Sequence, residues 1–251
     1  MKVNKNMNQF DGKKTLRRIV AGVLLASALS SFTACGKTPI LTPTGDGGYE
    51  MDKSDMQYFM ADDCYEPASY IKDKVVAQND GVDFYAVEGV TGESWLYSPD
   101  FGLMLYAKDE KLPTLEEMHC DAVHICLEDE TTIEIYKEEN ATLVSAIVDA
   151  YLHGTQLIYP MKKAAYSFRV KFASSEYPWL RYGVIFLQYA EDYIVQTTDE
   201  NGQPIEVNYG KNFLYNRSAG YFVAIGDEMQ KYIDDYYHSE DGNEVGNENG
   251  I

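Results

Sequence analysis

The alternation of apolar and polar residues around position 170 constrains the fold of this chain more than any other feature. Residues 166–172 read YSFRVKF, so an aromatic or aliphatic side chain stands at every second position. This two-residue period predicts a half-buried β-strand with one wet face. The run 182–189 is apolar on both faces and is expected in the centre of a sheet. A shorter strand is expected at 132–136. The Asn201-Gly202 pair is typical of a hairpin turn, which predicts antiparallel pairing around it.

Two segments have the spacing of amphipathic helices. The first is predicted to begin after the N-cap Asn140 and to end at His153, before Gly154. The second is predicted from Asp227 to Tyr237. The residues expected to face inward on the two helices are Leu143, Ile147, Ala150 and Tyr151, and Met229, Tyr232, Ile233 and Tyr236. A third, shorter helical turn is expected at 114–118. The sequence therefore predicts an α+β fold, with antiparallel sheet and two or three helices.

Residues 94–110 and 212–228 resemble each other. Each copy has the pattern of a strand, a glycine turn, a second strand and an acidic helix start. The identical pairs are Leu96 and Leu214, Tyr97 and Tyr215, Gly102 and Gly220, Asp109 and Asp227, and Glu110 and Glu228. One interpretation is a duplication, with similar halves at 55–137 and 138–237. The alternative is two unrelated hairpins that share one turn chemistry.

Composition marks the limits of the globular region. Residues 35–54 are rich in Gly, Pro, Thr and Asp without a hydrophobic period, so we expect a flexible tether there. Residues 238–251 are mostly Gly, Asn, Glu and Asp and are expected to form a disordered acidic tail. The globular domain is therefore predicted at 55–237.

The chain is strongly acidic. It has 21 Lys and Arg against 40 Asp and Glu, a formal charge of −19. Such a charge repels phosphate backbones, so a nucleic-acid partner is not expected. It also repels anionic lipid headgroups. A cationic partner is allowed, although the charge equally fits a solubility role on an exposed domain.

Residues 1–34 have the organisation of a secretory signal peptide. Lys13, Lys14, Arg17 and Arg18 precede the apolar run 19–29. A basic region, a short apolar region and small residues before a cleavage point are typical of such leaders. A membrane-spanning helix needs about 20 apolar residues, and this run is shorter.

The leader ends in Phe32-Thr33-Ala34-Cys35-Gly36, which resembles the lipobox of bacterial membrane lipoproteins. Ala34, Cys35 and Gly36 match that pattern, whereas Phe32 stands where leucine is usual. The resemblance covers about residues 13–36. It implies a mature chain that begins at a diacylated, palmitate-bearing Cys35, anchored at the outer face of the cytoplasmic membrane. It implies no enzymatic function. The alternative is a plain signal peptide cleaved elsewhere.

The segment 119–126 gathers residue types that bind zinc or copper. In an extended strand Cys120 and Cys126 lie about 20 Å apart, too far to share an ion or a disulfide. His124 and Cys126 remain as candidate ligands, and His119 joins them if the chain turns after Met118. The alternative is an apolar strand with small, buried cysteines.

An aromatic loop is expected between the strands at 166–172 and 182–189. Tyr177 and Trp179 in this loop are candidates for stacking on a sugar or a peptide. The alternative is that Trp179 folds back onto the core, as large aromatic residues usually do.

Common catalytic motifs are absent from the sequence. It has no Gly-x-Ser-x-Gly, no phosphate-binding glycine loop, no His-Glu-x-x-His and no dinucleotide fingerprint. We therefore expect a non-catalytic binding or interaction module without a cofactor. Its expected partners are the bilayer, through the acyl anchor, and an extracellular protein, peptide or glycan. Two alternatives remain open: a metal-binding or thiol-dependent enzyme centred on His119, His124 and Cys126, and a small solute-binding lipoprotein.

Overall fold

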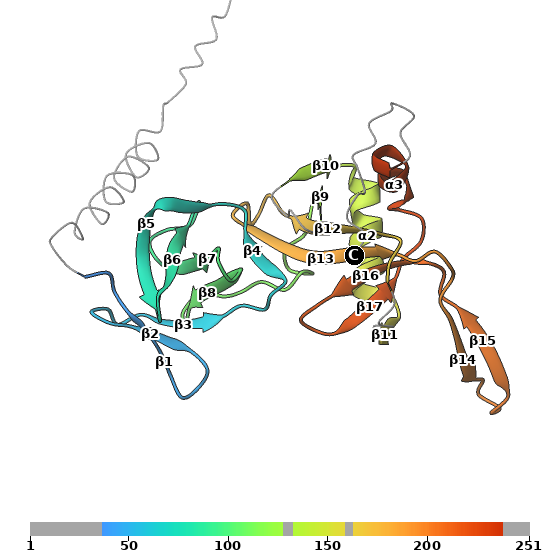
Figure 1. Cartoon of the computed structure of the whole chain (residues 1–251), viewed down its shortest axis with the longest axis horizontal. Coiled ribbons are helices and arrows are strands. Elements are labelled where there is room, and N and C mark those ends of the chain that lie inside the picture. Colours follow the sequence, from blue (N-terminus) through green and yellow to red (C-terminus); the bar gives the residue numbers. More distant parts are fainter. Residues whose placement is uncertain (1–36, 128–132, 159–162, 238–251) are drawn as a thin grey trace, which may run out of the picture.

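The computed structural model describes residues 37–127, 133–158 and 163–237 (Figure 1). Within these residues the chain is mainly antiparallel sheet with two helices, so the α+β class is only roughly met. The chain has fewer helical residues than expected, because residues 115–119 form a turn and not the short helix predicted at 114–118. The leader 1–34, Cys35 and the tail 238–251 lie outside the described residues.

The N-terminal sheet is curled. Its strands, in spatial order, are β1 (Leu41–Pro43), β2 (Tyr49–Met51), β3 (Gln57–Met60), β8 (Leu103–Ala107), β7 (Trp95–Ser98), β6 (Val82–Val87) and β5 (Tyr70–Asn79). An isolated bridge joins Ile40 to Gln78, so the first and last strands of the order meet. The curl encloses a small core that includes Leu41, Tyr58 and Phe84. The sheet therefore curls into a half-barrel that a single bridge joins at the end of β5.

The N-terminal strands correct the expected tether at 35–54. Leu41 and Met51 are 1% and 4% exposed, and β1 and β2 pair with each other in the sheet. The Gly and Asp residues lie in the turn between these strands, where Gly47 has a φ of +85°. Glycine adopts such an angle without strain, so the composition of a linker here serves a tight turn.

The C-terminal sheet is larger and has one strand from the N-terminal region. Its strands, in spatial order, are β10 (Glu134–Glu138), β9 (Ala122–Cys126), β12 (Tyr166–Ala173), β13 (Leu180–Gln188), β16 (Asn212–Asn216), β17 (Tyr221–Ala224) and β11 (Gln156–Ile158), and β4 (Tyr65–Pro67) also pairs with β13. The sequence predictions of strands at 166–172 and 182–189 are confirmed, and the second lies centrally. β14 (Ile194–Thr198) and β15 (Pro204–Asn208) form the hairpin expected around Asn201-Gly202, which projects from the body (Figure 1).

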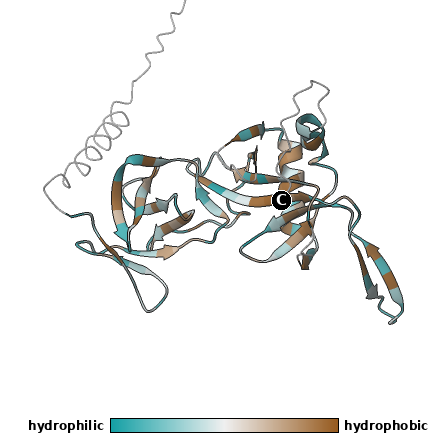
Figure 2. Cartoon of the chain, viewed as in Figure 1, coloured by the Kyte–Doolittle hydropathy of each residue, from teal (hydrophilic) through white to brown (hydrophobic). Residues whose placement is uncertain are grey.

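Two helices cover one face of the C-terminal sheet. They are α2 (Ala141–His153) and α3 (Gln230–Tyr237). The Asn140 side chain accepts hydrogen bonds from the amides of Thr142 and Leu143, which confirms the predicted cap. The inward residues of α2 are Val144, Ile147 and Tyr151, a stripe shifted slightly from the predicted one. Hydrophobic residues follow α2 and the strands that it covers (Figure 2).

The two resembling segments form matching hairpins in different sheets. In β7–β8, Trp95 pairs with Tyr106; in β16–β17, the aligned Phe213 pairs with Ala224. Gly102 and Gly220 both have positive φ, at 62° and 71°. No helix follows the first hairpin within the described residues up to 127. The proposed halves are not separate, because β9 from the first half lies within the C-terminal sheet.

A buried polar network lies under α2. Asn216 Nδ2 donates to the Tyr151 hydroxyl at 2.8 Å and to the Tyr182 hydroxyl at 3.1 Å. The two hydroxyls lie 3.2 Å apart. Asn216 Oδ1 also accepts a hydrogen bond from the Ala219 amide at 3.0 Å, so this one side chain satisfies several buried groups.

Replacing Asn216 with leucine is expected to lower the free energy of unfolding by about 1–3 kcal/mol. The change keeps the branched shape of the side chain but leaves the Tyr151 and Tyr182 hydroxyls short of a partner. Urea unfolding measures the loss. Asn201→Leu, in the exposed turn of the β14–β15 hairpin, is the control and should change stability by less than about 0.5 kcal/mol. Equal stability of the two variants would contradict the role assigned to the network.

Glu138 connects the end of β10 to α3. Its carboxylate accepts hydrogen bonds from Lys231 Nζ and the Tyr232 hydroxyl, both at 2.7 Å, and from the Asn140 amide at 2.8 Å. These donors, Lys231 above all, hold the pKa of Glu138 at about 2, against 4.5 for an ordinary glutamate. The ionised form therefore stabilises the folded state.

Glu138→Gln is expected to have an effect that depends on pH. Because the folded pKa is the lower one, the contribution is complete above pH 4.5 and is lost as the pH falls towards 2. At pH 7 the variant should lose about 1–3 kcal/mol of unfolding free energy. Urea unfolding from pH 7 to 2.5 should show wild type and variant converging. Glu139→Gln, at an exposed carboxylate, is the control. A difference that persists unchanged at pH 2.5 would contradict this account.

Candidate ligand-binding face

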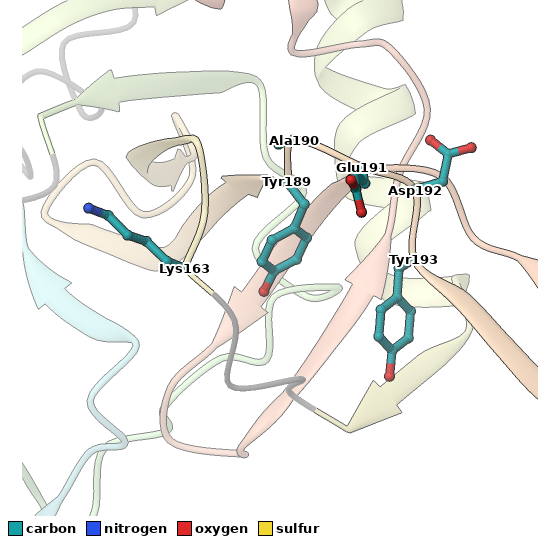
Figure 3. Close-up of a pocket in the computed structure, with 6 residues that line it drawn as sticks. All are labelled: Lys163, Tyr189, Ala190, Glu191, Asp192 and Tyr193. Carbon is teal, nitrogen blue, oxygen red and sulfur yellow. The ribbon is translucent and has the colours of Figure 1, made fainter.

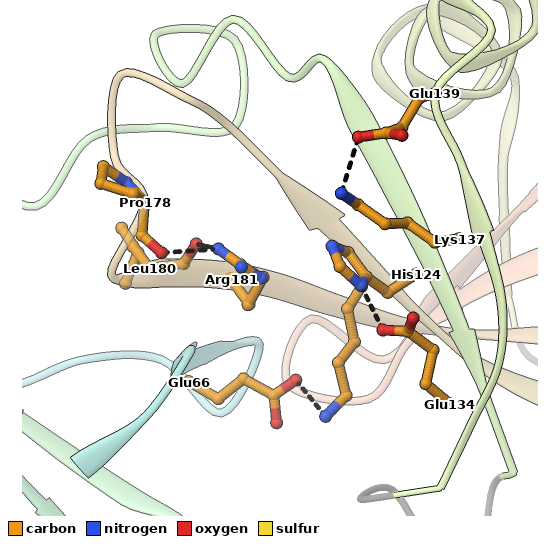
Figure 4. Close-up of polar contacts among 9 residues, drawn as sticks. Glu66, His124, Glu134, Lys137, Glu139, Pro178, Leu180 and Arg181 are labelled. Atoms are coloured by element: carbon orange, nitrogen blue, oxygen red, sulfur yellow. Dashed lines mark hydrogen bonds and ion pairs between the residues drawn. The ribbon is translucent and has the colours of Figure 1, made fainter. Parts of the chain in front are cut away.

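The face of the C-terminal sheet opposite the helices carries charged side chains. Alternation along β12 turns Phe168, Val170 and Phe172 into the core, so Arg169 and Lys171 lie on the other face. The same rule places His124 of β9 beside Lys171, with which it pairs in register. We call the charged face the set Glu66, His124, Arg169, Lys171 and Arg181, from β4, β9, β12 and β13. Figure 4 labels three of them, Glu66, His124 and Arg181.

Glu66 and Lys171 form the central ion pair of the charged face. Lys171 Nζ lies 3.0 Å from Glu66 Oε1, and the two side chains are only 16% and 17% exposed. Glu66 sits opposite Arg181 in the β4–β13 register, so Lys171 reaches it from β12 across β13. Partial burial weakens screening by water, which strengthens this pair relative to a surface pair.

Arg181 is held by the loop that precedes its own strand. Its Nη1 donates to the Pro178 carbonyl at 3.0 Å and to the Leu180 carbonyl at 2.8 Å (Figure 4). Burial lowers the pKa of the Arg181 guanidinium, and Glu66 and Glu134 oppose that shift. An arginine remains charged in any such setting, so the face keeps a half-buried cation here.

Arg169 lies flat across Gly183. A Cβ at Gly183 would stand 2.4 to 2.8 Å from three guanidinium atoms of Arg169, namely Nη2, Cζ and Nε. Near-equal distances to these atoms place the guanidinium plane against the strand. Arg169 Nε is buried and has no hydrogen-bond partner among the described residues. The missing side chain at Gly183 therefore makes room for a cation whose donors are not fully used.

Three tyrosines of the N-terminal sheet form a cluster of rings, and one of them, Tyr97, feels the charges of Glu66 and Arg169. The ring of Tyr70 lies 5.3 Å from that of Tyr97 and 5.5 Å from that of Tyr85, and we call these residues the tyrosine row. Burial raises the pKa of Tyr97 to about 12; Glu66 and Tyr70 add to the shift and Arg169 opposes it. Tyr97 thus keeps its proton and its hydroxyl remains a hydrogen-bond donor.

The residues predicted as metal ligands do not come together. His124 pairs with Glu134 through Nδ1 (Figure 4), whereas His119 is exposed in the turn before β9, with its Nδ1 3.3 Å from Glu176. Cys126 is buried on β9, two residues beyond His124. No group of three His, Cys, Asp or Glu side chains in the part of the chain that the structure describes is arranged to hold a metal ion.

The described cysteines are free, protonated thiols. Burial raises the pKa of Cys64 to about 11 and that of Cys120 to about 12, and it also raises the pKa of Cys126. A thiol acts as a nucleophile through its thiolate, which these positions disfavour. Cys64 and Cys126 are instead buried as small apolar side chains, and Cys120 packs partly buried against the core.

Tyr177 and Trp179 pack where the two sheets meet. The rings of Trp179 and Trp95 are 4.5 Å apart, and Tyr177 lies edge-on to Trp179 at 6.3 Å. Both are partly buried against the core, as expected if the loop folds back. The Trp179 carbonyl also accepts a hydrogen bond from the Ala68 amide at 2.8 Å, which fixes the loop next to β4.

A pocket lies at the base of the β14–β15 hairpin. Tyr189, Glu191, Asp192 and Tyr193 line it together with Lys163 and Ala190 (Figure 3). Its volume of about 130 Å³ is below the roughly 300 Å³ at which small-molecule sites begin. This pocket therefore suits a small ion or water better than an organic solute.

No sequence motif points to Glu66, Arg169, Lys171, Arg181 or the tyrosine row. Arg169 and Lys171 were recognised only as the wet positions of a strand. The one signal that could have singled them out is Gly183, a glycine inside an otherwise apolar central strand, because such a glycine often marks the close approach of another group.

No helix in the described part of the chain combines the length and the apolar character needed to cross a membrane. Comparison with known proteins adds no relative: no family model, no curated protein and no solved structure matches this chain.

Proposed function

We propose that this chain is a non-catalytic binding module, held at the outer face of a bacterial cytoplasmic membrane by acyl chains on Cys35, with the charged face and the tyrosine row as its binding surface. One observation carries the binding surface. Arg169 lies half-buried across Gly183. Its Nε is buried, and no described residue accepts a hydrogen bond from it. Nε itself is closed to solvent, but the residue is only partly buried and no described residue bonds to Nη1 or Nη2, so those two donors are the ones a ligand could use.

The state of the nucleophiles supports a non-catalytic role. The thiols of Cys64, Cys120 and Cys126 have raised pKa values, and His124 is engaged by Glu134. A binding surface needs only oriented donors and apolar area, which the charged face and the tyrosine row offer together.

The fold also limits how far the module can stand from the anchor. The sheet contacts begin at Pro39 and Ile40, since the Pro39 carbonyl accepts a hydrogen bond from the Gln78 amide at 2.9 Å. Residues 35–39 reach at most about 17 Å at roughly 3.4 Å per residue. A lipidated Cys35 would therefore hold the domain close to the bilayer.

Two measurements on the full chain test this proposal. Mass spectrometry of the native N-terminus should find acyl chains on Cys35, and an unmodified thiol there would refute the anchor. An array of extracellular glycans and peptides should reveal ligands that wild type binds and Arg169→Met does not. If every ligand found binds the two forms equally, the charged face is not the binding surface.

A further inference from the structure

The hairpin of β14 and β15 projects from the body as a ribbon of two strands, and we call residues 191–208 the hairpin arm (Figure 1). Its base is fixed to the core, because the Tyr193 ring lies 6.0 Å from that of Phe213 and 5.5 Å from that of Phe222. The Tyr193 amide also donates to the Gly210 carbonyl at 2.7 Å. Beyond this base, β14 and β15 pair with each other and with no other described strand. Two strands alone are only marginally stable in water, so further pairing would stabilise the arm.

The two outer edges of the hairpin arm differ. The Asp199 amide donates to the Gln203 carbonyl, so in this register the odd-numbered residues bond across the pair and the even-numbered ones direct N–H and C=O outward. Proline and charge protect an edge strand from pairing, and the outer edge of β15 has both, in Pro204 and Glu206. The outward residues of β14 are uncharged and include no proline, namely Ile194, Gln196 and Thr198. The open edge of the arm is therefore that of β14.

The hairpin arm carries only negative charge. It has no Lys, Arg or His, and its five carboxylates are those of Glu191, Asp192, Asp199, Glu200 and Glu206. Asp192 and Asp199 accept hydrogen bonds from neutral donors, the Asn208 side chain and the Asn201 amide. No ion pair within the described ranges includes any of the five. The negative charge of the arm is therefore uncompensated.

We propose that the open edge of β14 binds an extended segment of a basic protein as an added strand. Asp192 lies two residues before β14, and Asp199 and Glu200 follow it directly. Lysine or arginine residues at both ends of the added strand would thus meet carboxylates, which selects the partner, while backbone hydrogen bonds supply affinity. Between these ends the added strand would extend the apolar face on which Val195 pairs with Val207. This surface does not include the charged face, and the inference does not depend on the proposed function.

The same carboxylates disfavour the other occupants of this edge. If two copies of the chain paired antiparallel about Gln196 of β14, Asp192 of each would stand opposite Glu200 of the other, and opposed like charges destabilise a sheet. Residues 238–251 carry four carboxylates and no Lys or Arg, so they too are repelled. The arm also lies at the opposite end of the body from β1, which the proposed anchor precedes (Figure 1). A basic protein outside the membrane remains the matching partner.

The test is fluorescence anisotropy of labelled peptides titrated with the full chain in detergent micelles. The first peptide has two lysines at each end of an alternating Thr-Val core of five residues. The second has proline at the centre of that core and the same charge, and the third has glutamates in place of the lysines. We expect the first peptide to bind at least tenfold more tightly than each of the others. Equal binding of the proline peptide would show attraction by charge alone and would overturn the proposal.

A matched pair of proline variants locates the interaction. Gln196→Pro removes the central outward N–H of β14 but no backbone hydrogen bond between β14 and β15, and it should weaken binding of the lysine peptide at least tenfold. Glu206→Pro, opposite it in register, removes the same side-chain hydrogen bond and blocks the other edge. This control should bind the lysine peptide within about threefold of wild type. Equal binding to wild type and Gln196→Pro would contradict the assignment to β14.

The double variant Asp192→Asn/Glu200→Gln keeps the edge and removes a charge from each of its ends. It should weaken binding of the lysine peptide about threefold to tenfold, and it gives the answer if thermal unfolding shows that Gln196→Pro is misfolded. Glu50→Gln/Asp55→Asn removes two exposed carboxylates near β2 and should bind as wild type does. Equal losses in the two double variants would overturn the proposal. So would a wild-type dimer, detected by sedimentation, that Gln196→Pro dissociates, because the edge would then belong to a second copy.

Discussion

Trp95→Ala is expected to lower the free energy of unfolding by about 3–5 kcal/mol, the range for a fully buried tryptophan. Trp95 is 1% exposed in β7 of the N-terminal sheet. Its ring stacks on Tyr106 at 5.5 Å and packs on Trp179, from the loop before β13, at 4.5 Å. The residue belongs to the core that also contains the inward residues of β12, β13 and α2. Its loss would loosen both sheets together.

Urea denaturation followed by circular dichroism measures this effect. Phe101→Ala, in the turn that follows β7, is the matched control because Phe101 is 70% exposed. This change should lower the free energy of unfolding by less than about 0.5 kcal/mol. Trp95→Ala should still unfold in one transition. Two separate transitions, or a loss below 1 kcal/mol, would show that the sheets do not depend on each other through Trp95.

Leu41→Ala is expected to cost about 2–5 kcal/mol, although the local sequence has the composition of a linker. Leu41 is 1% exposed in β1 and packs with the small core of the N-terminal sheet. The bridge between Ile40 and Gln78, which brings β1 to β5, depends on the same segment. Removing the leucine leaves a cavity where the curled sheet closes.

The control for this prediction is Thr42→Ala, since Thr42 is the exposed neighbour in the same strand. Thermal unfolding of the two variants should differ by several degrees. If both variants match wild type, residues 39–52 contribute nothing to the fold and the expectation of a flexible tether is restored.

Local sequence patterns predicted an element correctly where a single hydrophobic period ran along its whole length. The YSFRVKF alternation predicted β12, and the Asn140 cap with its apolar spacing predicted α2. Patterns failed where elements were short. β1 and β2 have three residues each, too few to show a period, and their stability comes from pairing with distant strands. The start of α3 was placed three residues early because acidic residues at 227 and 228 lie before the first helical turn.

The candidate binding surface could not be predicted in the same way. Up to about a hundred positions separate Tyr97, Glu66 and Arg169 in the sequence. No local sequence pattern links these three residues. Glu66 reaches Lys171 because β4 pairs with β13 and carries Glu66 into the C-terminal sheet. The predicted metal ligands His119, His124 and Cys126 are close in sequence. Along a turn and an extended strand, however, residues close in sequence have side chains that lie far apart.

Residue order alone determined which positions along β12 and β13 are apolar, where α2 begins, and that Arg169 and Lys171 share a wet face. Those properties depend on neighbours within a few residues. Only the tertiary structure decided that the N-terminal strands curl on themselves, that Glu66 reaches Lys171, and that Arg169 rests on Gly183. Such contacts join distant segments, and their formation depends on how the whole core packs.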